Sequence, residues 1–280
     1  MSRAAVFAYH DVGVRCLRVL LDAGVAVPLV VTHRDDPRER VWFASVAELS
    51  RERGIPTLLD PGNEEIESRL REIAPEFIFS FYYRRLLPEA VLRLASRGAY
   101  NMHGSLLPKY RGRAPVNWAV LHGERETGAT LHEMTAKPDA GRIVDQEAVP
   151  IGPDDTAAEV FRRVTDAAER VLVRSLKPLV EGKARLRPNE LAQGSYFGGR
   201  RPEDGRIDWR RSAREIHNLV RAVAPPYPGA FCDRLLVYRT RLEERAAPPG
   251  PLGPYRENGE WFARCGDGKV LRLLDVREKQ

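Results

Sequence analysis

The chain has 280 residues, 43% of them hydrophobic, and carries a formal net charge of +6 from 45 basic and 39 acidic residues. This length and composition exclude a disordered or fibrous protein and allow one large or two unequal domains. No apolar run approaches the roughly 20 residues of a membrane span, and no signal-peptide pattern precedes the first strand-like segment, so we expect a cytoplasmic protein without membrane insertion. The charge alone does not choose between a nucleic acid and a small anionic substrate.

Short apolar runs alternate with amphipathic stretches through the first hundred residues, which is typical of a parallel, doubly wound sheet. The runs are continuously apolar, as expected of strands that are covered on both faces. The predicted fold class is therefore α/β, with a Rossmann-like, mostly parallel sheet. Strands are predicted at residues 4–8, 25–31, 55–59, 77–81 and 99–102, and helices at 12–21, 44–52 and 64–73.

Two further strands are predicted at 128–133 and 143–149, on either side of a loop that contains Asp139. A proline and a glycine in this loop favour a tight turn that folds back over the strand ends. A helix is predicted at 156–180, with residues 154–156 as its N-terminal cap.

Regular periodicity is lost between about residues 185 and 206, where glycine, proline and charged residues accumulate, and we expect a domain linker there. The predicted organisation is a catalytic domain at 1–185, a linker at 186–205 and a small, mostly β domain at 206–280. The elements predicted for this last domain are a helix at 212–223, strands at 229–240, 260–265 and 269–276, and a proline-rich loop at 248–254.

The three cysteines, Cys16, Cys232 and Cys265, are odd in number and widely spaced. No Cys-x-x-Cys pair is present, so the sequence indicates neither a disulfide framework nor a zinc site. We expect all three to be small packing residues and the protein to hold no metal.

The segment that begins at Asn101 places a carboxamide and an imidazole two residues apart at the end of a predicted strand. Side chains two apart in an extended chain point to the same face, so Asn101 and His103 can converge on one carbonyl group while Met102 packs into the core. With Asp139 they supply an oxyanion donor, a proton-transfer group and a carboxylate, which is the equipment for moving an acyl group onto an amine. Taken singly, the asparagine and aspartate could be turn residues and the histidine a structural one.

These residues resemble the signature of the 10-formyltetrahydrofolate-dependent formyltransferases. That signature has an Asn-x-His pair, a Ser-Leu-Leu-Pro (here 105–108), an aromatic-Arg-Gly (here 110–112) and a downstream Asp. The similarity runs over nearly the whole chain, including 222–231 and 265–268. Within the family, it is greatest to the branch formed by the formyltransferase halves of bifunctional polymyxin-resistance proteins, at segments 6–11, 80–84 and 109–115.

The resemblance implies an enzyme that takes the formyl group of 10-formyltetrahydrofolate, as co-substrate, to the 4-amino group of UDP-4-amino-4-deoxy-L-arabinose, in lipid A modification and polymyxin resistance. It implies that Asn101, His103 and Asp139 are catalytic, with the histidine paired to the aspartate, and that the C-terminal domain is an open, OB-like β-barrel. The positions at which relatives hold the folate correspond to Arg85, Leu86, Leu87, Arg113, Thr135, Ala136, Lys137, Pro138 and Asp139.

Other acceptors remain open, of which initiator methionyl-tRNA is the strongest rival. Formyltransferases that modify it have a Gly- and Lys-rich loop where this chain has residues 32–42, a segment of mixed charge that would bind phosphates poorly. We therefore expect a nucleotide-sugar substrate and no nucleic-acid partner. Sugars linked to dTDP or GDP are further alternatives, and a binding protein without turnover is disfavoured by the intact catalytic residues.

Two nucleotide-binding fingerprints are absent from the sequence. No Gly-x-Gly-x-x-Gly follows the first predicted strand, so we expect no NAD or FAD, and no Gly-x-x-x-x-Gly-Lys-Ser/Thr is present for ATP-driven activation of formate. The dehydrogenase-decarboxylase half of the bifunctional relatives needs such a fingerprint. We therefore expect a free-standing or excised formyltransferase, for which a separate UDP-glucuronate decarboxylating dehydrogenase is a possible partner.

Overall fold

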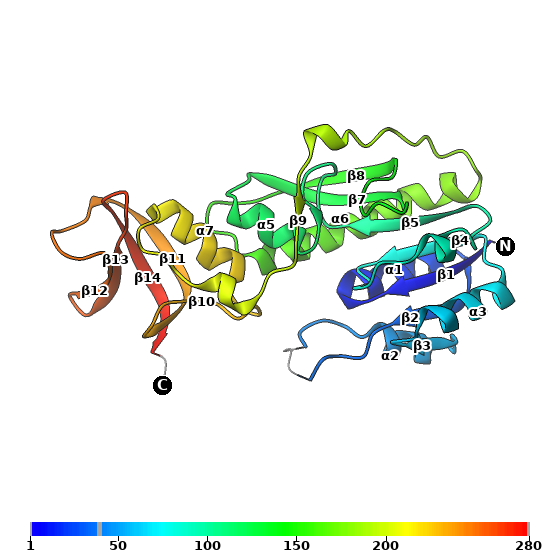
Figure 1. Ribbon diagram of the computed structural model, residues 1–280, viewed down its shortest axis with the longest axis horizontal. Helices are drawn as coiled ribbons and strands as arrows, with labels where there is room; N and C mark the ends of the chain where they lie inside the picture. The colour runs from blue at the N-terminus through cyan, green and yellow to red at the C-terminus, as the bar shows by residue number, and fades with distance from the viewer. Residues whose placement is uncertain (1, 38–40, 279–280) are drawn as a thin grey trace. The chain divides into compact units, whose positions relative to one another are not determined.

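The computed structural model of the chain describes residues 2–37 and 41–278 (Figure 1). The chain forms two compact units, each assembled from segments that are not consecutive in sequence. The first comprises residues 1–112, 128–149 and 163–196, and the second residues 113–127, 150–162 and 197–280.

The first unit is built on a seven-stranded sheet in the order β3-β2-β1-β4-β5-β7-β8. The first five of these strands are parallel to one another, and β7 pairs with β5 in the antiparallel direction. The strands are β1 (Arg3–Ala8), β2 (Ala26–Thr32), β3 (Thr57–Leu59), β4 (Phe77–Phe81), β5 (Gly98–His103), β7 (Glu126–Glu133) and β8 (Ile143–Pro150). The predicted Rossmann-like, mostly parallel sheet is confirmed.

Helices cover both faces of the parallel strands, which is why β1, β2 and β4 are mainly apolar rather than alternating. On one face, α3 and α4 pack through Ile66, Leu70 and Val91 against β1, β2 and β4. On the other, α1 contacts the same three strands, and Arg15 joins it to α6 by ion pairs with Asp166 and Glu169. The first unit contains α1 (His10–Asp22), α2 (Val46–Glu52), α3 (Asn63–Ile73) and α4 (Glu89–Leu92); α5 (Pro115–Leu121) belongs to the second unit, and α6 (Ala157–Val180) has residues in both.

The helix α6 begins where its capping residues predict. The hydroxyl of Thr156 accepts a hydrogen bond from the N–H of Glu159 at 3.3 Å, and the carboxylate of Glu159 accepts one from the N–H of Thr156 at 2.8 Å. This reciprocal pair satisfies two backbone donors that a helix N-terminus otherwise leaves unbonded. No helix within residues 2–37 and 41–278 combines the length and apolar character needed to cross a bilayer.

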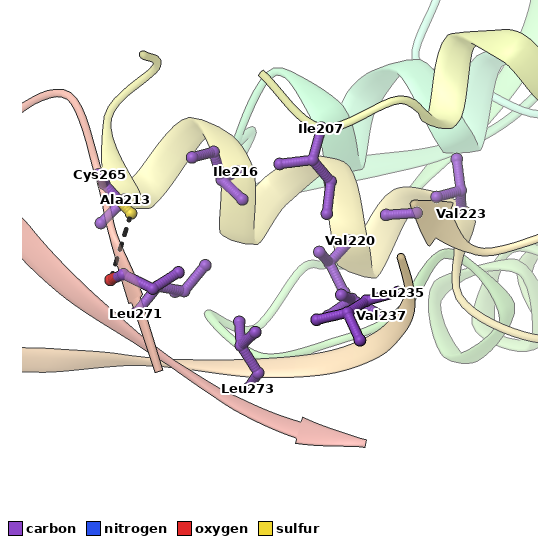
Figure 2. Close-up of a cluster of buried hydrophobic side chains, with 12 residues drawn as sticks. Ile207, Ala213, Ile216, Val220, Val223, Leu235, Val237, Cys265, Leu271 and Leu273 are labelled. Carbon is purple, nitrogen blue, oxygen red and sulfur yellow. Dashed lines mark hydrogen bonds between the residues drawn. The ribbon is translucent and has the colours of Figure 1, made fainter. Parts of the chain in front are cut away.

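The second unit contains a five-stranded antiparallel sheet in the order β10-β11-β14-β13-β12. Figure 2 shows the side chains of Ile216 and Val220, on one face of α7, pointing toward Leu235, Leu271 and Leu273 of the sheet. This apolar layer is the core of the unit. Its elements are α7 (Ala213–Val223), β10 (Ala230–Phe231), β11 (Leu235–Ala246), β12 (Gly253–Glu257), β13 (Glu260–Arg264) and β14 (Lys269–Glu278).

Two details of this sheet differ from the sequence prediction. The single strand predicted at 229–240 is a hairpin, because the chain reverses after β10 and the N–H of Cys232 donates to the carbonyl of Leu235 at 2.9 Å. The loop predicted at 248–254 ends early, because Gly253 already pairs with Arg264 at the start of β12. The strands β10 and β12 are short and lie beside turns, so the periodic pattern in each is too brief to be recognised.

The residues predicted as a linker contain short elements of their own: the 3₁₀ turns at Leu191–Gln193 and Pro202–Gly205 and the strand β9 (Tyr196–Phe197). Part of this segment is bonded within the first unit. The N–H of Ile143 donates to the carbonyl of Arg187 at 2.8 Å, and the N–H of Arg111, in the short strand β6 (Arg111–Gly112), donates to the carbonyl of Ser195 at 3.0 Å. The boundaries 1–185, 186–205 and 206–280 stay a prediction.

The substitution Gly128→Ala tests the close approach of β7 to β8. A Cβ atom at this position would lie 2.1 Å from the carbonyl oxygen of Glu147 and 2.6 Å from the side chain of Leu106. We expect the overlap to lower the free energy of unfolding by about 2 to 3 kcal/mol in urea denaturation. Gly62→Ala, where a Cβ meets nothing within 4 Å, is the control and should cost less than about 1 kcal/mol. Equal losses from both variants would contradict the close approach.

Candidate active site

The pairing of β5 with β7 brings Asn101 opposite His132. The Nδ2 group of the asparagine lies 3.1 Å from Nε2 of the histidine, and Nδ1 of the histidine donates to the carbonyl of Glu133 at 2.7 Å. In the neutral imidazole, Nε2 therefore accepts one amide hydrogen of Asn101. The carboxamide is held in one orientation, with its second N–H left for another acceptor.

The predicted alternation along β5 is confirmed at Met102, which is 1% exposed in the core, whereas His103 turns toward the Asp139 loop. Both Asn101 and His103 lie within β5, because the pairing with β7 extends this strand to residue 103. Nε2 of His103 donates to the carbonyl of Tyr110 at 2.8 Å. Its Nδ1 lies 3.6 Å from Oδ1 of Asp139, so this nitrogen can take up a proton beside a carboxylate.

Asp139 is a carboxylate at the centre of the site whose side chain is only 13% exposed. Its Oδ2 accepts a hydrogen bond from the N–H of Gly112 at 2.8 Å, and its Oδ1 lies 3.5 Å from Nε2 of His132. The residue adopts a left-handed backbone with φ of 49°, which aspartate tolerates better than most residues. The amide of Asn189 fixes this turn by donating to the carbonyls of Asp139 and Gly141 at 3.1 and 3.2 Å.

The surroundings of Asp139 keep it ionised. Burial alone would raise the pKa of the carboxyl group, but the electrostatic influence of the neighbouring His103 and His132 rings, together with the N–H of Gly112, outweighs burial and lowers that pKa well below its ordinary value. A permanent carboxylate is therefore available to stabilise a proton on either imidazole. The site thus places an ionised carboxylate beside two imidazole rings.

The predicted folate positions fall in two loops of the first unit. After β4, a guanidinium nitrogen of Arg85 donates to the carbonyl of Pro61 at 2.6 Å, Leu86 is 75% exposed, and Leu87 packs on the core under α3 and α4. After β7, Thr135 donates its hydroxyl to the carbonyl of Lys137 at 2.9 Å, and Ala136, Lys137 and Pro138 lead into Asp139 with partly or fully exposed side chains.

Arg113 differs from the other predicted positions because it belongs to the second unit. Its N–H donates to the carbonyl of Phe197 at 3.0 Å within that unit. It directly follows Gly112, whose own N–H binds Asp139 in the first unit. The structure brings Asn101, His103 and Asp139 together, and the role of Arg113 stays a prediction.

Two members of the site were not predicted from the sequence. His132 lies near the end of β7, a strand whose residues are buried except at its two ends. A histidine on such a strand is the sequence signal that could have indicated it. Asn189 lies in the predicted linker and carries no local signal at all. Among the described residues, no group of three or more His, Cys, Asp or Glu side chains is arranged to hold a metal ion.

The ionisation of Asp139 should appear in the pH dependence of stability. Because its pKa is lower in the folded than in the unfolded chain, the charge contributes stability that is fully present above the unfolded value of about 3.9 and is lost as pH falls through the folded value. We expect Asp139→Asn to cost about 1 to 2 kcal/mol at pH 7. In urea denaturation the gap between wild type and variant should shrink below pH 4. A gap that stays constant from pH 7 to pH 3 would contradict an ionised Asp139.

Comparison with known proteins identifies the family. Residues 20–176 match the family model described as formyl transferase, and residues 200–280 match the one described as formyl transferase, C-terminal domain. The N-formyltransferase from Helicobacter canadensis, solved with folinic acid and dTDP-3-aminofucose, is 19% identical with a TM-score of 0.81, and the match covers 100% of both chains.

Two further solved structures share the fold. WlaRD, a sugar 3N-formyl transferase solved with dTDP and 5-N-formyl-THF, is 20% identical over 98% of this chain and 97% of its own, with a TM-score of 0.79. Glycinamide ribonucleotide transformylase 1 from Symbiobacterium toebii is 25% identical over 68% of this chain and 95% of its own, with a TM-score of 0.58. The first family model alone spans more than half of the chain. The chain described here belongs to the formyl transferase family.

Proposed function

We propose that this enzyme transfers the formyl group of 10-formyltetrahydrofolate to the amino group of a nucleotide-linked amino sugar. The observation that carries the proposal is the convergence of Asn101, His103 and Asp139 within a formyl transferase fold. Support for the donor and acceptor classes comes from the H. canadensis enzyme and WlaRD, whose structures hold a folate together with a dTDP-sugar or dTDP.

In the proposed reaction, the acceptor amine attacks the formyl carbon and the C=O bond becomes a C–O⁻ single bond. The free N–H of the Asn101 carboxamide donates to this oxygen as the negative charge develops. His103 takes the proton that the amine loses, and Asp139 stabilises the resulting imidazolium. Collapse of the intermediate restores the carbonyl, breaks the bond to N10 of the folate and places the proton on that nitrogen.

The donor would lie between the two loops that carry the predicted folate positions. Backbone groups of residues 85–87 and 135–139 can hold the edge of a pterin without requiring particular side chains. We include Arg113 as a contact to the folate on the strength of the sequence resemblance alone.

For the acceptor we propose UDP-4-amino-4-deoxy-L-arabinose, which would connect the enzyme to lipid A modification and polymyxin resistance. The support is the likeness of segments 6–11, 80–84 and 109–115 to the polymyxin-resistance branch. A dTDP-linked amino sugar is the second candidate, favoured by the molecules bound to the two sugar enzymes. The mixed charges at the described ends of segment 32–42 disfavour tRNA, although residues 38–40 of that segment lie outside the described ranges.

The acceptor is tested by following tetrahydrofolate release from 10-formyltetrahydrofolate with three acceptors in separate reactions. We expect turnover with UDP-4-amino-4-deoxy-L-arabinose and none with initiator methionyl-tRNA. Turnover with a dTDP-amino sugar instead would keep the reaction and change the sugar. Turnover with the tRNA alone would overturn the nucleotide-sugar assignment, and formate release without any acceptor would indicate hydrolysis.

The orientation of Asn101 is tested by substitutions at Asn101 and His132. Asn101→Ala should lower kcat about 100- to 1000-fold, because it removes a donor to the developing oxyanion. His132→Leu should lower kcat about tenfold, since the carboxamide loses the acceptor that holds it. His132→Gln, whose amide oxygen can accept the same hydrogen bond, should recover most of that loss. Full activity of the leucine variant would show that Asn101 is positioned without His132.

A further inference from the structure

A buried histidine, His33, joins the carboxyl ends of three parallel strands. It follows β2, with its side chain 8% exposed, and it lies between Asp60, which follows β3, and Arg84, in the loop after β4. The strands β2 and β4 are not neighbours, because β1 lies between them. The ring therefore bridges the end of β1, where Tyr9 packs edge-on against it with ring centroids 5.5 Å apart.

The hydrogen bonds of His33 fix its tautomer. Nδ1 lies 2.8 Å from Oδ1 of Asp60, and Nε2 lies 3.1 Å from the backbone N of Arg84. A carboxylate only accepts and a backbone N–H only donates, so the ring must carry its proton on Nδ1 and a lone pair on Nε2. Only the neutral imidazole can make both bonds. The other carboxylate oxygen of Asp60 accepts from the N–H of Arg34 at 3.0 Å, which holds the acid in place.

We infer that His33 is a positioning residue for the formyl donor: as a neutral ring, it fixes the backbone at Arg84 and thereby the shape of the loop at 85–87. The inference rests on the proposed function, in which this loop holds the folate. It assigns His33 to the donor side of the reaction and not to the transfer of protons.

His33 contacts the loop at two successive residues, Tyr83 and Arg84. The ring of Tyr83 stacks on His33 with centroids 4.3 Å apart and planes 16° apart, so the imidazole orients the residue before Arg84 as well. Arg85 adds its hydrogen bond to the carbonyl of Pro61. Leu86 is exposed, so the fixed backbone on either side determines where its side chain lies.

The charged groups around His33 oppose one another. Burial disfavours the imidazolium, Asp60 favours it, and the guanidinium groups of Arg84 and Arg85 disfavour it; the sum lowers the pKa of His33 below its ordinary value. The tyrosine rings of Tyr9 and Tyr83, which also face the imidazole, are neutral at physiological pH. The ring is accordingly neutral at pH 7 and gains a proton only as pH falls below about 6.5. Protonation then puts a hydrogen on Nε2, where the N–H of Arg84 needs an acceptor.

The test compares binding of folinic acid by isothermal titration calorimetry for the full-length wild type and the variants His33→Leu and His33→Gln. Leucine removes both hydrogen bonds, so we expect its Kd for folinic acid to rise about tenfold or more. Glutamine can donate to Asp60 and accept from Arg84, so it should bind within about threefold of wild type. Steady-state kinetics should agree, with KM for 10-formyltetrahydrofolate raised by leucine and kcat and acceptor KM little changed.

The matched control is His217→Gln, at a buried histidine of the second unit that bonds Thr240 and the carbonyl of Pro153. It should lower thermal stability and leave folinic acid binding unchanged. A second measurement does not require the leucine variant. The Kd of the wild type for folinic acid should rise as pH falls from 7 to 5. The Kd of His33→Gln should depend less on pH, because glutamine has no titrating group at this position.

The outcomes separate this inference from the proposed function. If the wild type binds folinic acid and a folded His33→Leu binds it equally well, the positioning role is wrong and the proposed function stands. If His33→Leu does not fold, identical pH profiles for the wild type and the glutamine variant would overturn the inference. If the wild type fails to bind folinic acid at all, the proposed donor is wrong, and the inference that rests on it is wrong as well.

Discussion

The antiparallel pairing of β7 with β5 is the constraint on which the site depends. This pairing places Asn101 opposite His132. Because β7 runs antiparallel to β5, the chain that leaves the end of β7 moves away from His103. The following loop must therefore turn back to bring Asp139 to the histidine. This reversal is made by the left-handed backbone of Asp139 and by Gly141, where a Cβ would lie 2.1 Å from the carbonyl oxygen of Glu133. A strand direction thus dictates the backbone strain at the centre of the site.

The carboxylate of Asp139 is surrounded by polar groups from three directions. Gly112 gives a backbone N–H from the chain after β5, His132 approaches from β7, and His103 approaches from β5. The amide of Asn189 stabilises the turn through the backbone carbonyls of Asp139 and Gly141 rather than through the carboxylate. The position of the carboxylate is therefore fixed by groups of the protein itself.

The sequence predicts those parts of the protein that local patterns encode. The strands β1, β2 and β4 are mainly apolar runs, and Asn101 and His103 share one face of β5 because residues two apart do so in any strand. Asn189 and His33 could not be found this way, since each acts across a long separation in sequence, on the Asp139 turn and on the loop after β4 respectively. The hairpin at β10 and β11 was missed for the opposite reason, because a two-residue strand carries too little pattern. Tertiary contacts, and not local propensity, determine the roles of Asn189 and His33 and the formation of the β10–β11 hairpin.

The segments of the two units are interleaved along the chain, and this limits how the protein can be divided. Residues 113–127 and 150–162 belong to the second unit although first-unit segments lie on both sides of them. Within that unit, α5 packs on α7, with the amide of Asn117 bonded to the carbonyl of Ala222 at 2.9 Å. A polypeptide that stopped near residue 185 would keep α5, lose α7 and expose the surface between them to water. Neither unit can therefore be cut out of this chain as one uninterrupted piece, because each is assembled from three separate segments of the sequence.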